Sequence, residues 1–383
     1  MKLLEQSADA EHFQRQRFSI AMATFNGEAY IREQLNSLAR QILLPYELVV
    51  CDDGSSDRTL NILQEFQKAA PFPVKIYGNP RRLGFADNFL QAASRCSREW
   101  VAFCDQDDMW FPEKLLSVSE AIQNSQASDL MLVTHAVRVA GEDVSLRNGR
   151  QPHSREDRTI GPNTWSAAAL GGVTTLHSCK DRTIGPNCHP GFWGLPGFTC
   201  IFRRELITCF DWKVRPKSYD GNYPSQTHDK WICMLANAFG SVHHIAKPLV
   251  VYRRHDAVLT GYYERKSLGA RIALSKRVGA ERYAFMELVA RESAAVLSAL
   301  AQSAANPRWS DNLMHSRNLF EKLASNCAMR AELYRQKELK SKFVTFMRLV
   351  ASRGYFGNAF YSFGMSSFLK DLVCCFARQA SGE

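Results

Sequence analysis

The chain has 383 residues, of which 45% are hydrophobic and 22% are charged, and its net charge is +10. This length predicts two or three domains, and the composition is typical of a globular protein, which excludes intrinsic disorder and collagen-like structure. The charge is uneven, because residues 264–383 hold 19 Lys and Arg against 10 Asp and Glu, a net +9. A basic tail on a nearly neutral body suggests two parts with different partners.

The sequence predicts neither a membrane-spanning helix nor a disulfide framework. The longest uncharged runs, 159–179 and 183–202, are broken by Gly, Pro, Asn and His. Charged residues stand among the first 17 positions, where a signal peptide needs an apolar core. The eleven cysteines are scattered without a CxxC pair, which is typical of reduced thiols. We therefore expect a cytoplasmic protein.

After a tail of residues 1–16, two kinds of segment alternate. Helical periodicity predicts helices over Glu28–Gln41 and Asp57–Lys68. Short, apolar, β-favouring runs predict strands at Phe18–Thr24, Glu47–Cys51, Val74–Tyr77 and Trp100–Cys104. This alternation predicts an α/β fold with a mainly parallel sheet flanked by helices. Ligands of such sheets bind in the loops at the carboxyl ends of the strands.

Residues 141–197 form a variable loop region rich in Gly, Pro, Asn, Ser and His. The sequence DRTIGPN occurs there twice, at Asp157–Asn163 and Asp181–Asn187, which indicates a duplicated insertion. Periodic structure resumes at Phe198–Leu206. It continues with a predicted helix and two predicted short strands, over Thr227–Phe239, Ser241–Ile245 and Leu249–Tyr252.

Residues 263–383 form a basic helical C-terminal region. Helices are expected at Arg265–Val278, Arg282–Gln302 and Asp311–Val350. The segment Tyr355–Leu369 is aromatic and uncharged but too short to span a bilayer. Two interpretations of its aromatic residues stay open: they could contact an anionic membrane surface, or they could form the core of a helical subdomain.

The densest chemical signal is the segment Asp105–Asp108, directly after a predicted strand. Its three carboxylates repel one another unless a cation or hydrogen-bond donors lie among them. Mg²⁺ takes one or two carboxylates together with phosphate oxygens, which fits this spacing. The alternative is a solvated acidic turn before the helix that starts near Pro112. A second acidic loop on the same edge of the sheet favours the metal site.

That second loop is Asp52–Asp57, which follows another predicted strand. A carboxylate at a strand end can accept a hydrogen bond from a nucleobase or a ribose hydroxyl, and Asp53 is placed for this role. An Asx-turn and a helix cap explain part of the loop, and we assign Asp57 to capping.

Several motifs in order resemble the family 2 glycosyltransferases, and in particular rhamnosyltransferase-like enzymes of bacterial polysaccharide assembly. The resemblance covers residues 17–262, the expected catalytic domain. The seven motifs are Ala23–Gly27, Asp52–Asp57, Arg82–Asn88, Asp105–Asp108, Gly197–Leu206, His228–Trp231 and Tyr252–His255. Any one motif is weak, but five or six of them in this order and spacing are specific.

The resemblance implies a GT-A fold, a nucleotide-diphosphate sugar donor and a divalent metal, Mg²⁺ or Mn²⁺. Asp105 and Asp107 would form the metal-binding DxD pair, with Asp107 as the more direct ligand and Asp108 in support. His255 would be a further metal or diphosphate contact. The implied nucleotide-sugar-binding residues are Thr24, Asn26, Asp52, Asp53, Arg82, Asn88 and Asp105.

By the same resemblance, Asp229 is the candidate general base. Displacement at an anomeric carbon requires a carboxylate within about 3 Å of the acceptor hydroxyl. The alternative for Asp229 is a stabilising carboxylate in the first turn of a helix. The implied acceptor-side residues are Trp193, Gly197, His228 and Trp231.

We therefore expect an inverting, metal-dependent hexosyltransferase, with rhamnose among several open sugars. It would act at the inner face of the cell membrane on a glycan or lipid-linked acceptor. Four alternatives compete: an inactive nucleotide-sugar-binding relative, a glycoside hydrolase, a basic nucleic-acid binder and a zinc site. The hydrolase leaves the nucleoside loop unexplained, and no nucleic-acid-binding motif is present, so we expect no nucleic-acid partner. The zinc candidates lack paired spacing; they are His177, Cys179, Cys188, His189 and Cys200.

Overall fold

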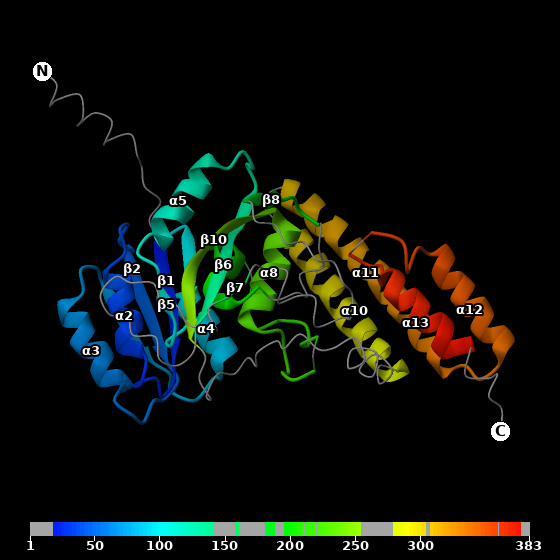
Figure 1. The fold of residues 1–383 in the computed structure, drawn as a ribbon, viewed down its shortest axis with the longest axis horizontal. Helices are drawn as coiled ribbons and strands as arrows, with labels where there is room; N and C mark the ends of the chain where they lie inside the picture. The colour runs from blue at the N-terminus through cyan, green and yellow to red at the C-terminus, as the bar shows by residue number, and fades with distance from the viewer. Residues whose placement is uncertain are drawn as a thin grey trace, which may run out of the picture.

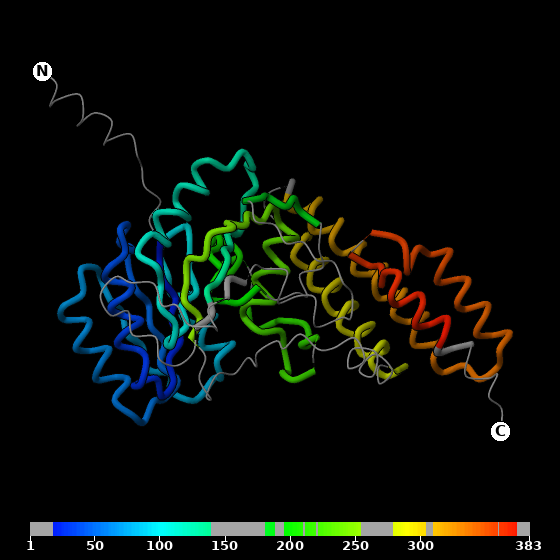
Figure 2. The backbone as a smooth tube through the Cα atoms, viewed as in Figure 1, coloured from blue at the N-terminus to red at the C-terminus, as the bar shows by residue number. Residues whose placement is uncertain are grey.

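The computed structural model describes most of the chain, with the sheet at one end of the molecule and a group of helices at the other (Figure 1). The described residues are 18–140, 158–160, 181–187, 195–209, 211–219, 221–253, 279–303, 307–358 and 360–376. They form a ten-stranded sheet in which eight strands follow the order β3-β2-β1-β4-β9-β6-β10-β5. The backbone tube in Figure 2 shows the same division between a sheet with flanking helices and a helical end.

The N-terminal half of the sheet is parallel, as predicted. Its strands are β1 (Phe18–Thr24), β2 (Glu47–Asp52), β3 (Val74–Gly78) and β4 (Trp100–Cys104), and all residues of β1, β2 and β4 are buried. The helices that flank it are α2 (Ile31–Ala39), α3 (Thr59–Ala69), α4 (Phe85–Ser94) and α5 (Lys114–Asn124). The expected α/β architecture is therefore confirmed, and α4 is a helix that periodicity did not predict.

Alternate side chains of each strand enter different hydrophobic clusters. In β1, Ile20 and Met22 pack with side chains of α2, α3 and α5, whereas Ala21 and Ala23 pack with α4. Helices thus cover both faces of the sheet, as buried parallel strands require.

The second half of the sheet is mixed. Its strands are β5 (Met109–Trp110), β6 (Leu130–Ala140), β9 (Ile201–Arg203) and β10 (Ser241–Arg253). Strand β9 is antiparallel to both β4 and β6, and it follows the short turn η1 (Gly197–Thr199). The two short strands predicted at Ser241–Ile245 and Leu249–Tyr252 are one strand, β10, whose register shifts between Ile245 and Pro248. Proline has no N–H to donate, which fits a bulge at this point.

Both copies of the repeat form short strands. β7 (Arg158–Ile160) pairs antiparallel with β6, and β8 (Arg182–Ile184) pairs antiparallel with β10. In the second copy, Asn187 donates its backbone N–H to Asn237 O (2.9 Å) and its side-chain amide to Asn312 O (3.3 Å). This copy therefore links a sheet strand to the helices behind it.

The C-terminal helices share a hydrophobic core with the sheet. α10 (Ala280–Ser303) and α11 (Pro307–Arg335) pack with α8 (His228–Phe239), so Trp231, Met286 and Leu313 belong to one cluster. α7 (Glu205–Thr208), α12 (Leu339–Ala351) and α13 (Gly364–Phe376) complete the helices. The single helix predicted over Asp311–Val350 is divided between α11 and α12. None of the described helices is long and apolar enough to cross a bilayer.

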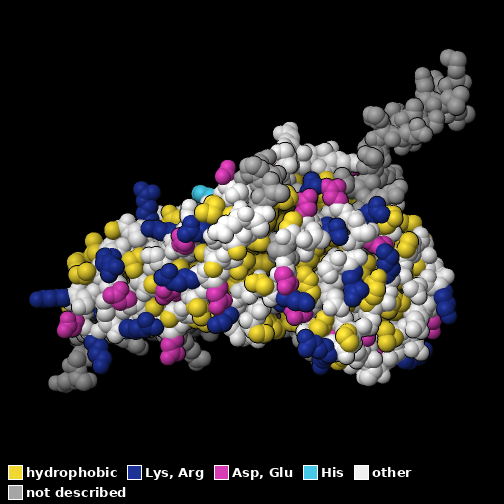
Figure 3. Space-filling view, turned by 180° about the vertical axis from the view of Figure 1, so that it is seen from behind, with side chains coloured by type: hydrophobic (Ala, Val, Ile, Leu, Met, Phe, Trp, Pro, Cys, Tyr) yellow, Lys and Arg dark blue, Asp and Glu magenta, His cyan; other side chains and the backbone are white. Residues whose placement is uncertain are grey.

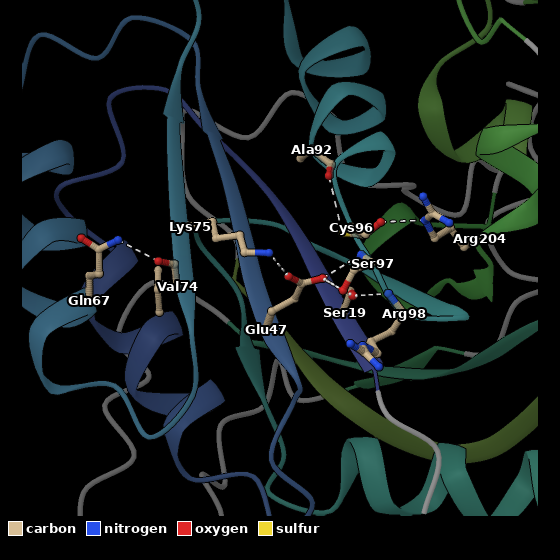
Figure 4. A network of polar contacts seen from close by, with 10 residues as sticks. All are labelled: Ser19, Glu47, Gln67, Val74, Lys75, Ala92, Cys96, Ser97, Arg98 and Arg204. Atoms are coloured by element: carbon tan, nitrogen blue, oxygen red, sulfur yellow. Dashed lines mark hydrogen bonds and ion pairs between the residues drawn. The ribbon is translucent and has the colours of Figure 1, made fainter.

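The buried carboxylate of Glu47 joins the amino-terminal ends of β1, β2 and β3 (Figure 4). Glu47 accepts hydrogen bonds from Ser19 Oγ, Lys75 Nζ, Ser97 N and Ser97 Oγ, each at 2.7 Å. Burial alone would raise the pKa of this carboxyl, but the bonds from Lys75, Ser97 and Ser19 outweigh it and lower the pKa to about 2.

We expect Glu47→Gln to destabilise the fold in a pH-dependent way. A folded-state pKa of about 2 against an ordinary 4.5 means that this carboxylate stabilises the protein fully above pH 4.5. The contribution, about 2–3 kcal/mol, is lost as the pH falls toward 2. Urea unfolding of both proteins at pH 7 and pH 3.5 measures this, and the gap should narrow at the lower pH. Glu65→Gln, in an exposed pair with Arg32, is the control with little effect. An equal gap at both pH values would contradict the assignment.

Candidate active site

The loops that follow β1, β2 and β4 meet at the carboxyl edge of the parallel strands. These are residues 24–27, 52–57 and 105–108, the loops that the sequence singled out. Thr24 Oγ1 donates to Asp52 Oδ1 (2.8 Å), and Ser56 N donates to Asn26 Oδ1 (2.8 Å). Asn26 has a φ of 47°, in the left-handed region that Asn tolerates better than most residues. The first two loops are thus joined by their own side chains.

Asp52 organises the second loop. Its Oδ2 accepts the backbone N–H groups of Gly54 (3.1 Å) and Ser55 (2.8 Å), and its Oδ1 accepts Ser55 Oγ (2.6 Å). Asp57 Oδ1 accepts the backbone N–H of Thr59 (2.9 Å), the first residue of α3, but the N-cap of this helix is Arg58, one residue after the predicted cap.

Asp53 is almost fully buried and holds the loop that precedes α4. Its Oδ1 accepts Leu83 N (2.7 Å) and Asn79 Nδ2 (3.0 Å), and its Oδ2 accepts Gly84 N (2.8 Å). A carboxylate oxygen can accept two hydrogen bonds, so Oδ2 retains capacity for a further donor. In the same loop, the guanidinium of Arg82 lies 3.9 Å from the centre of the Phe25 ring.

Asn88 lies behind these loops rather than on their surface. It is buried, and its Nδ2 donates to Cys51 O (2.9 Å) while its Oδ1 accepts Asn79 Nδ2 (2.8 Å). These contacts hold the end of β2 against α4 and the loop before it.

Asp105, Asp107 and Asp108 form a compact acidic cluster. One carboxylate oxygen from each lies within 4.8 Å of those of the other two. Burial, followed by the neighbouring Asp107 carboxylate, raises the pKa of both Asp105 and Asp108. Asp108 Oδ1 accepts the backbone N–H of Arg253 (3.3 Å), whereas its buried Oδ2 has no hydrogen-bond partner among the described residues.

These properties fit a divalent cation. A hard cation is coordinated by several carboxylate oxygens at once, and its charge offsets their mutual repulsion. It would also give Asp108 Oδ2, to which no described residue donates a hydrogen bond, a partner. The donor set is all oxygen, as Mg²⁺ and Mn²⁺ prefer.

Lys114, whose charge acts on the cluster, and Glu33, the partner of Arg253, were not predicted as site residues. Lys114 is fully buried, donates to Phe198 O (2.7 Å) and lies 3.6 Å from the centre of the Trp110 ring. Burial lowers its pKa to about 7, although the nearby Asp108 and Asp105 carboxylates oppose this shift. In the sequence, the indication that Lys114 is buried is its position four residues before Val118, on the same face of α5. Glu33 pairs with the buried Arg253 guanidinium.

Asp229 lies in the first turn of α8. Its charge contributes to the raised pKa of Asp105, so the two carboxylates are close enough to interact. Asp229 Oδ1 accepts hydrogen bonds from Thr227 Oγ1 and from Lys230 N (2.8 Å), and the side chain is partly exposed. A positioned, partly exposed carboxylate beside a cation site can accept a proton.

His228 occupies an aromatic cage beneath Asp229. Its ring stacks on Phe89 at 4.2 Å and meets Phe103 edge-on at 4.8 Å. Burial lowers its pKa to about 4, so the imidazole is neutral at pH 7. Gly197 approaches so closely that a Cβ there would overlap His228 Nε2. Trp231 is fully buried in the core and supports α8 from behind.

Trp193 and His255 lie outside the described residues, as do four zinc candidates, His177, Cys179, Cys188 and His189. The fifth, Cys200, is buried with its sulfur 4.0 Å from that of Cys233. Among the described residues, the acidic cluster is the group of carboxylates, thiols and imidazoles close enough to hold a metal ion.

Known proteins resemble the part of the chain that carries this site. Residues 19–207 match the family model described as glycosyl transferase family 2. The dTDP-rhamnosyl transferase RfbG of Shigella flexneri is 34% identical over 111 residues, which are 28% of this chain and 38% of that protein. The glucosyltransferase WfgD of Escherichia coli, which uses UDP-Glc, is 33% identical over 108 residues, 28% of this chain and 42% of that protein. The chain thus spans about two-fifths of these relatives.

A solved structure of TarS residues 1–349 from S. aureus, in complex with UDP-GlcNAc, aligns with a TM-score of 0.46 and 18% identity. The alignment covers 88% of this chain and 81% of that one.

Proposed function

Since residues 19–207 place this chain in glycosyltransferase family 2, we propose that it transfers a sugar from a nucleotide-diphosphate sugar to a glycan or lipid-linked acceptor in cell-surface polysaccharide synthesis. The family match confirms the resemblance seen in the sequence motifs. The observation that carries the proposal is the acidic cluster of Asp105, Asp107 and Asp108, together with Asp229, whose charge acts on Asp105. A general base and a cation site on one edge of a sheet are the equipment for sugar transfer.

In the proposed reaction, Asp229 accepts the proton of an acceptor hydroxyl. The hydroxyl oxygen forms a bond to the anomeric carbon while the bond from that carbon to the diphosphate oxygen breaks. The nucleoside diphosphate leaves with the bonding electrons from the opposite face of the sugar, so the configuration inverts. Thr227 and the backbone N–H of Lys230 hold Asp229 Oδ1, which leaves the proton to its other oxygen.

A divalent cation at Asp105 and Asp107 would offset the negative charge on the leaving diphosphate. Arg82, stacked on Phe25 at the edge of the site, is the proposed cationic side chain for the same diphosphate. Asp53 would bind the nucleobase of the donor through Oδ2. Thr24, Asn26 and Asp52 would fix the shape of the loops that border the nucleoside. Asn88 supports that loop from behind.

The relatives use different donor sugars, so the sugar that this chain transfers is open. One relative is named for dTDP-rhamnose and another for UDP-Glc, and rhamnose is our first candidate. A thermal-shift panel of UDP, dTDP, GDP and CDP, each with and without Mn²⁺ or Mg²⁺, tests the function and the nucleotide together. A ligand at a hundredfold excess over its Kd adds about 2.7 kcal/mol of stability. We expect a shift with one nucleotide that requires the cation. No shift with any of them would support an inactive relative instead.

We also propose that the C-terminal helices contact an anionic membrane on its cytoplasmic side. Some aromatic residues of this region belong to the core, among them the buried Phe346, Tyr355 and Phe360, whereas Phe343 and Phe356 are exposed. Other apolar side chains of α12 and α13 are exposed, among them Leu339, Phe343, Val344, Met347, Met365, Leu369, Leu372 and Val373.

Basic residues accompany these exposed apolar side chains. Residues 335–373 contain seven Lys and Arg against two Asp and Glu, a net +5. One of the two acids, Asp371, is buried in an ion pair with Arg330. Figure 3 shows hydrophobic and basic side chains side by side over the helical end of the molecule. Each Lys or Arg near an anionic bilayer contributes about 1 kcal/mol to binding.

The double variant Phe343→Gln, Met347→Gln should bind vesicles about tenfold more weakly, because it removes apolar surface that would enter the bilayer. Both side chains are exposed, so folding should be unaffected. The measurement is sedimentation with vesicles of phosphatidylcholine and phosphatidylglycerol. Ile42→Gln with Leu44→Gln, exposed beyond α2, is the matched control. If the wild-type chain ignores vesicles but self-associates through these residues, the surface is a subunit interface.

A further inference from the structure

The amide of Gln106 joins the acidic loop to the neighbouring loop. Gln106 stands between Asp105 and Asp107, yet its Oε1 accepts Phe25 N (3.0 Å) and its Nε2 donates to Phe25 O (3.1 Å). Two residues of an antiparallel strand pair exchange the same two bonds. The parallel β1–β4 ladder ends at Met22 and Cys104, so Gln106 joins the two chain segments beyond the ends of these strands.

Gly27 leaves the room that this contact needs. A Cβ at Gly27 would lie 2.6 Å from Gln106 Cδ and would overlap Oε1. Gly27 is not among the residues with positive φ, so close approach rather than backbone conformation explains the glycine. Its N–H donates to Thr59 Oγ1 (2.7 Å), which anchors the loop on its far side.

Gln106 bonds to Phe25, which belongs to the segment 24–27 that borders the proposed nucleoside site. Within it, Asn26 N donates to Ser55 Oγ (2.9 Å) and Thr24 Oγ1 donates to Asp52 Oδ1 (2.8 Å). Hydrogen bonds therefore connect the loop at Asp52, through residues 24–27, to Gln106. The residues on both sides of Gln106 are the proposed cation ligands.

We propose that Gln106 is a positioning residue that couples nucleoside binding at residues 24–27 and 52–56 to divalent-cation binding at Asp105–Asp108. A nucleoside that orders residues 24–27 also fixes Gln106, and with it the backbone of Asp105 and Asp107. The cation then binds to a loop that is already ordered, and the reverse holds because such coupling is reciprocal. The inference rests on the proposed function and adds the route by which its two donor-side sites communicate.

The test uses a nucleoside without phosphates, chosen to match the nucleotide that the thermal-shift panel selects. Such a ligand has no phosphate oxygen to offer the cation, so its effect on the cation passes through the protein. The Kd for Mn²⁺ is measured from free Mn²⁺ by electron paramagnetic resonance, with and without saturating nucleoside. We expect the nucleoside to lower this Kd about fivefold or more in the wild-type protein.

In Gln106→Met, which keeps the length of the side chain and loses both hydrogen bonds, the ratio of the two Kd values should fall close to one. Gly27→Ala displaces the same amide from the other side and should give the same result. Gln67→Met removes a side-chain bond to Val74 O (2.7 Å) away from the site and should keep the wild-type ratio.

A wild-type ratio retained in both Gln106→Met and Gly27→Ala would overturn the proposal. A wild-type protein that binds both ligands independently would overturn it as well, while leaving the proposed function intact. A wild-type protein that binds neither Mn²⁺ nor any nucleoside diphosphate would overturn the proposed function together with the coupling.

Discussion

Asp107→Ala should abolish cation binding and sugar transfer together. Asp107 is partly exposed within the acidic cluster, and its charge raises the pKa of both Asp105 and Asp108. Removing it takes away a ligand and also the repulsion that makes a cation favourable there. We expect the Kd for Mn²⁺ to rise about a hundredfold or more and transfer to fall in parallel. Titration with Mn²⁺ measures both effects, with calorimetry reporting cation binding and the rate of sugar transfer reporting activity.

The matched control for this variant is Asp311→Ala, which removes an exposed carboxylate near the start of α11. It removes the same charge far from the cluster in sequence and should leave the Mn²⁺ titration unchanged. An Asp107→Ala protein that keeps the wild-type Mn²⁺ titration would show that the cation binds elsewhere. Activity lost without a change in cation affinity would instead assign Asp107 a role in orienting the donor.

The parallel strands were predictable because their signal is local. Phe18–Thr24 and Trp100–Cys104 are short, mostly apolar runs, and the structure gives them the predicted bounds. The insertion of β9 between β4 and β6 could not be predicted, because it pairs residues about 70 and about 100 positions apart and leaves no periodicity in the sequence. The break between α11 and α12 was missed for a related reason. Residues 336–338 are Gln, Lys and Glu, without the Gly or Pro that usually marks a helix end.

The candidate site shows the same division between local and distant signals. The strand-end rule together with carboxylate chemistry selected Asp52, Asp53 and the acidic cluster, which the structure brings to one edge. Gln106 and Lys114 were missed, since their partners Phe25 and Phe198 lie 81 and 84 residues away in sequence. Long-range contacts to backbone atoms require no particular residue type in the partner, so the sequence carries no mark of them.

Asp229→Asn should abolish transfer while nucleoside diphosphate affinity stays within a few-fold of wild type. The asparagine can keep the bonds that Thr227 Oγ1 and Lys230 N donate to Oδ1, so the start of α8 should be preserved. It has no basic oxygen to take the proton of the acceptor hydroxyl. Loss of a general base costs about 10²–10⁴ in rate, and we expect kcat to fall within that range. Steady-state transfer rates and calorimetric binding of the diphosphate measure the two quantities separately.

Asp211→Asn is the matched control that shows whether the effect of Asp229→Asn is specific to position 229. Asp211 lies upstream of α8, is exposed, and accepts Lys213 N (3.0 Å) much as Asp229 accepts Lys230 N. The same chemical change there should leave kcat unchanged, because Asp211 is not part of the proposed site. Near-normal transfer by Asp229→Asn would place the base on another residue. A fall in diphosphate affinity equal to the fall in kcat would mean that Asp229 holds the donor site together, because a base acts on the acceptor and should leave donor binding intact.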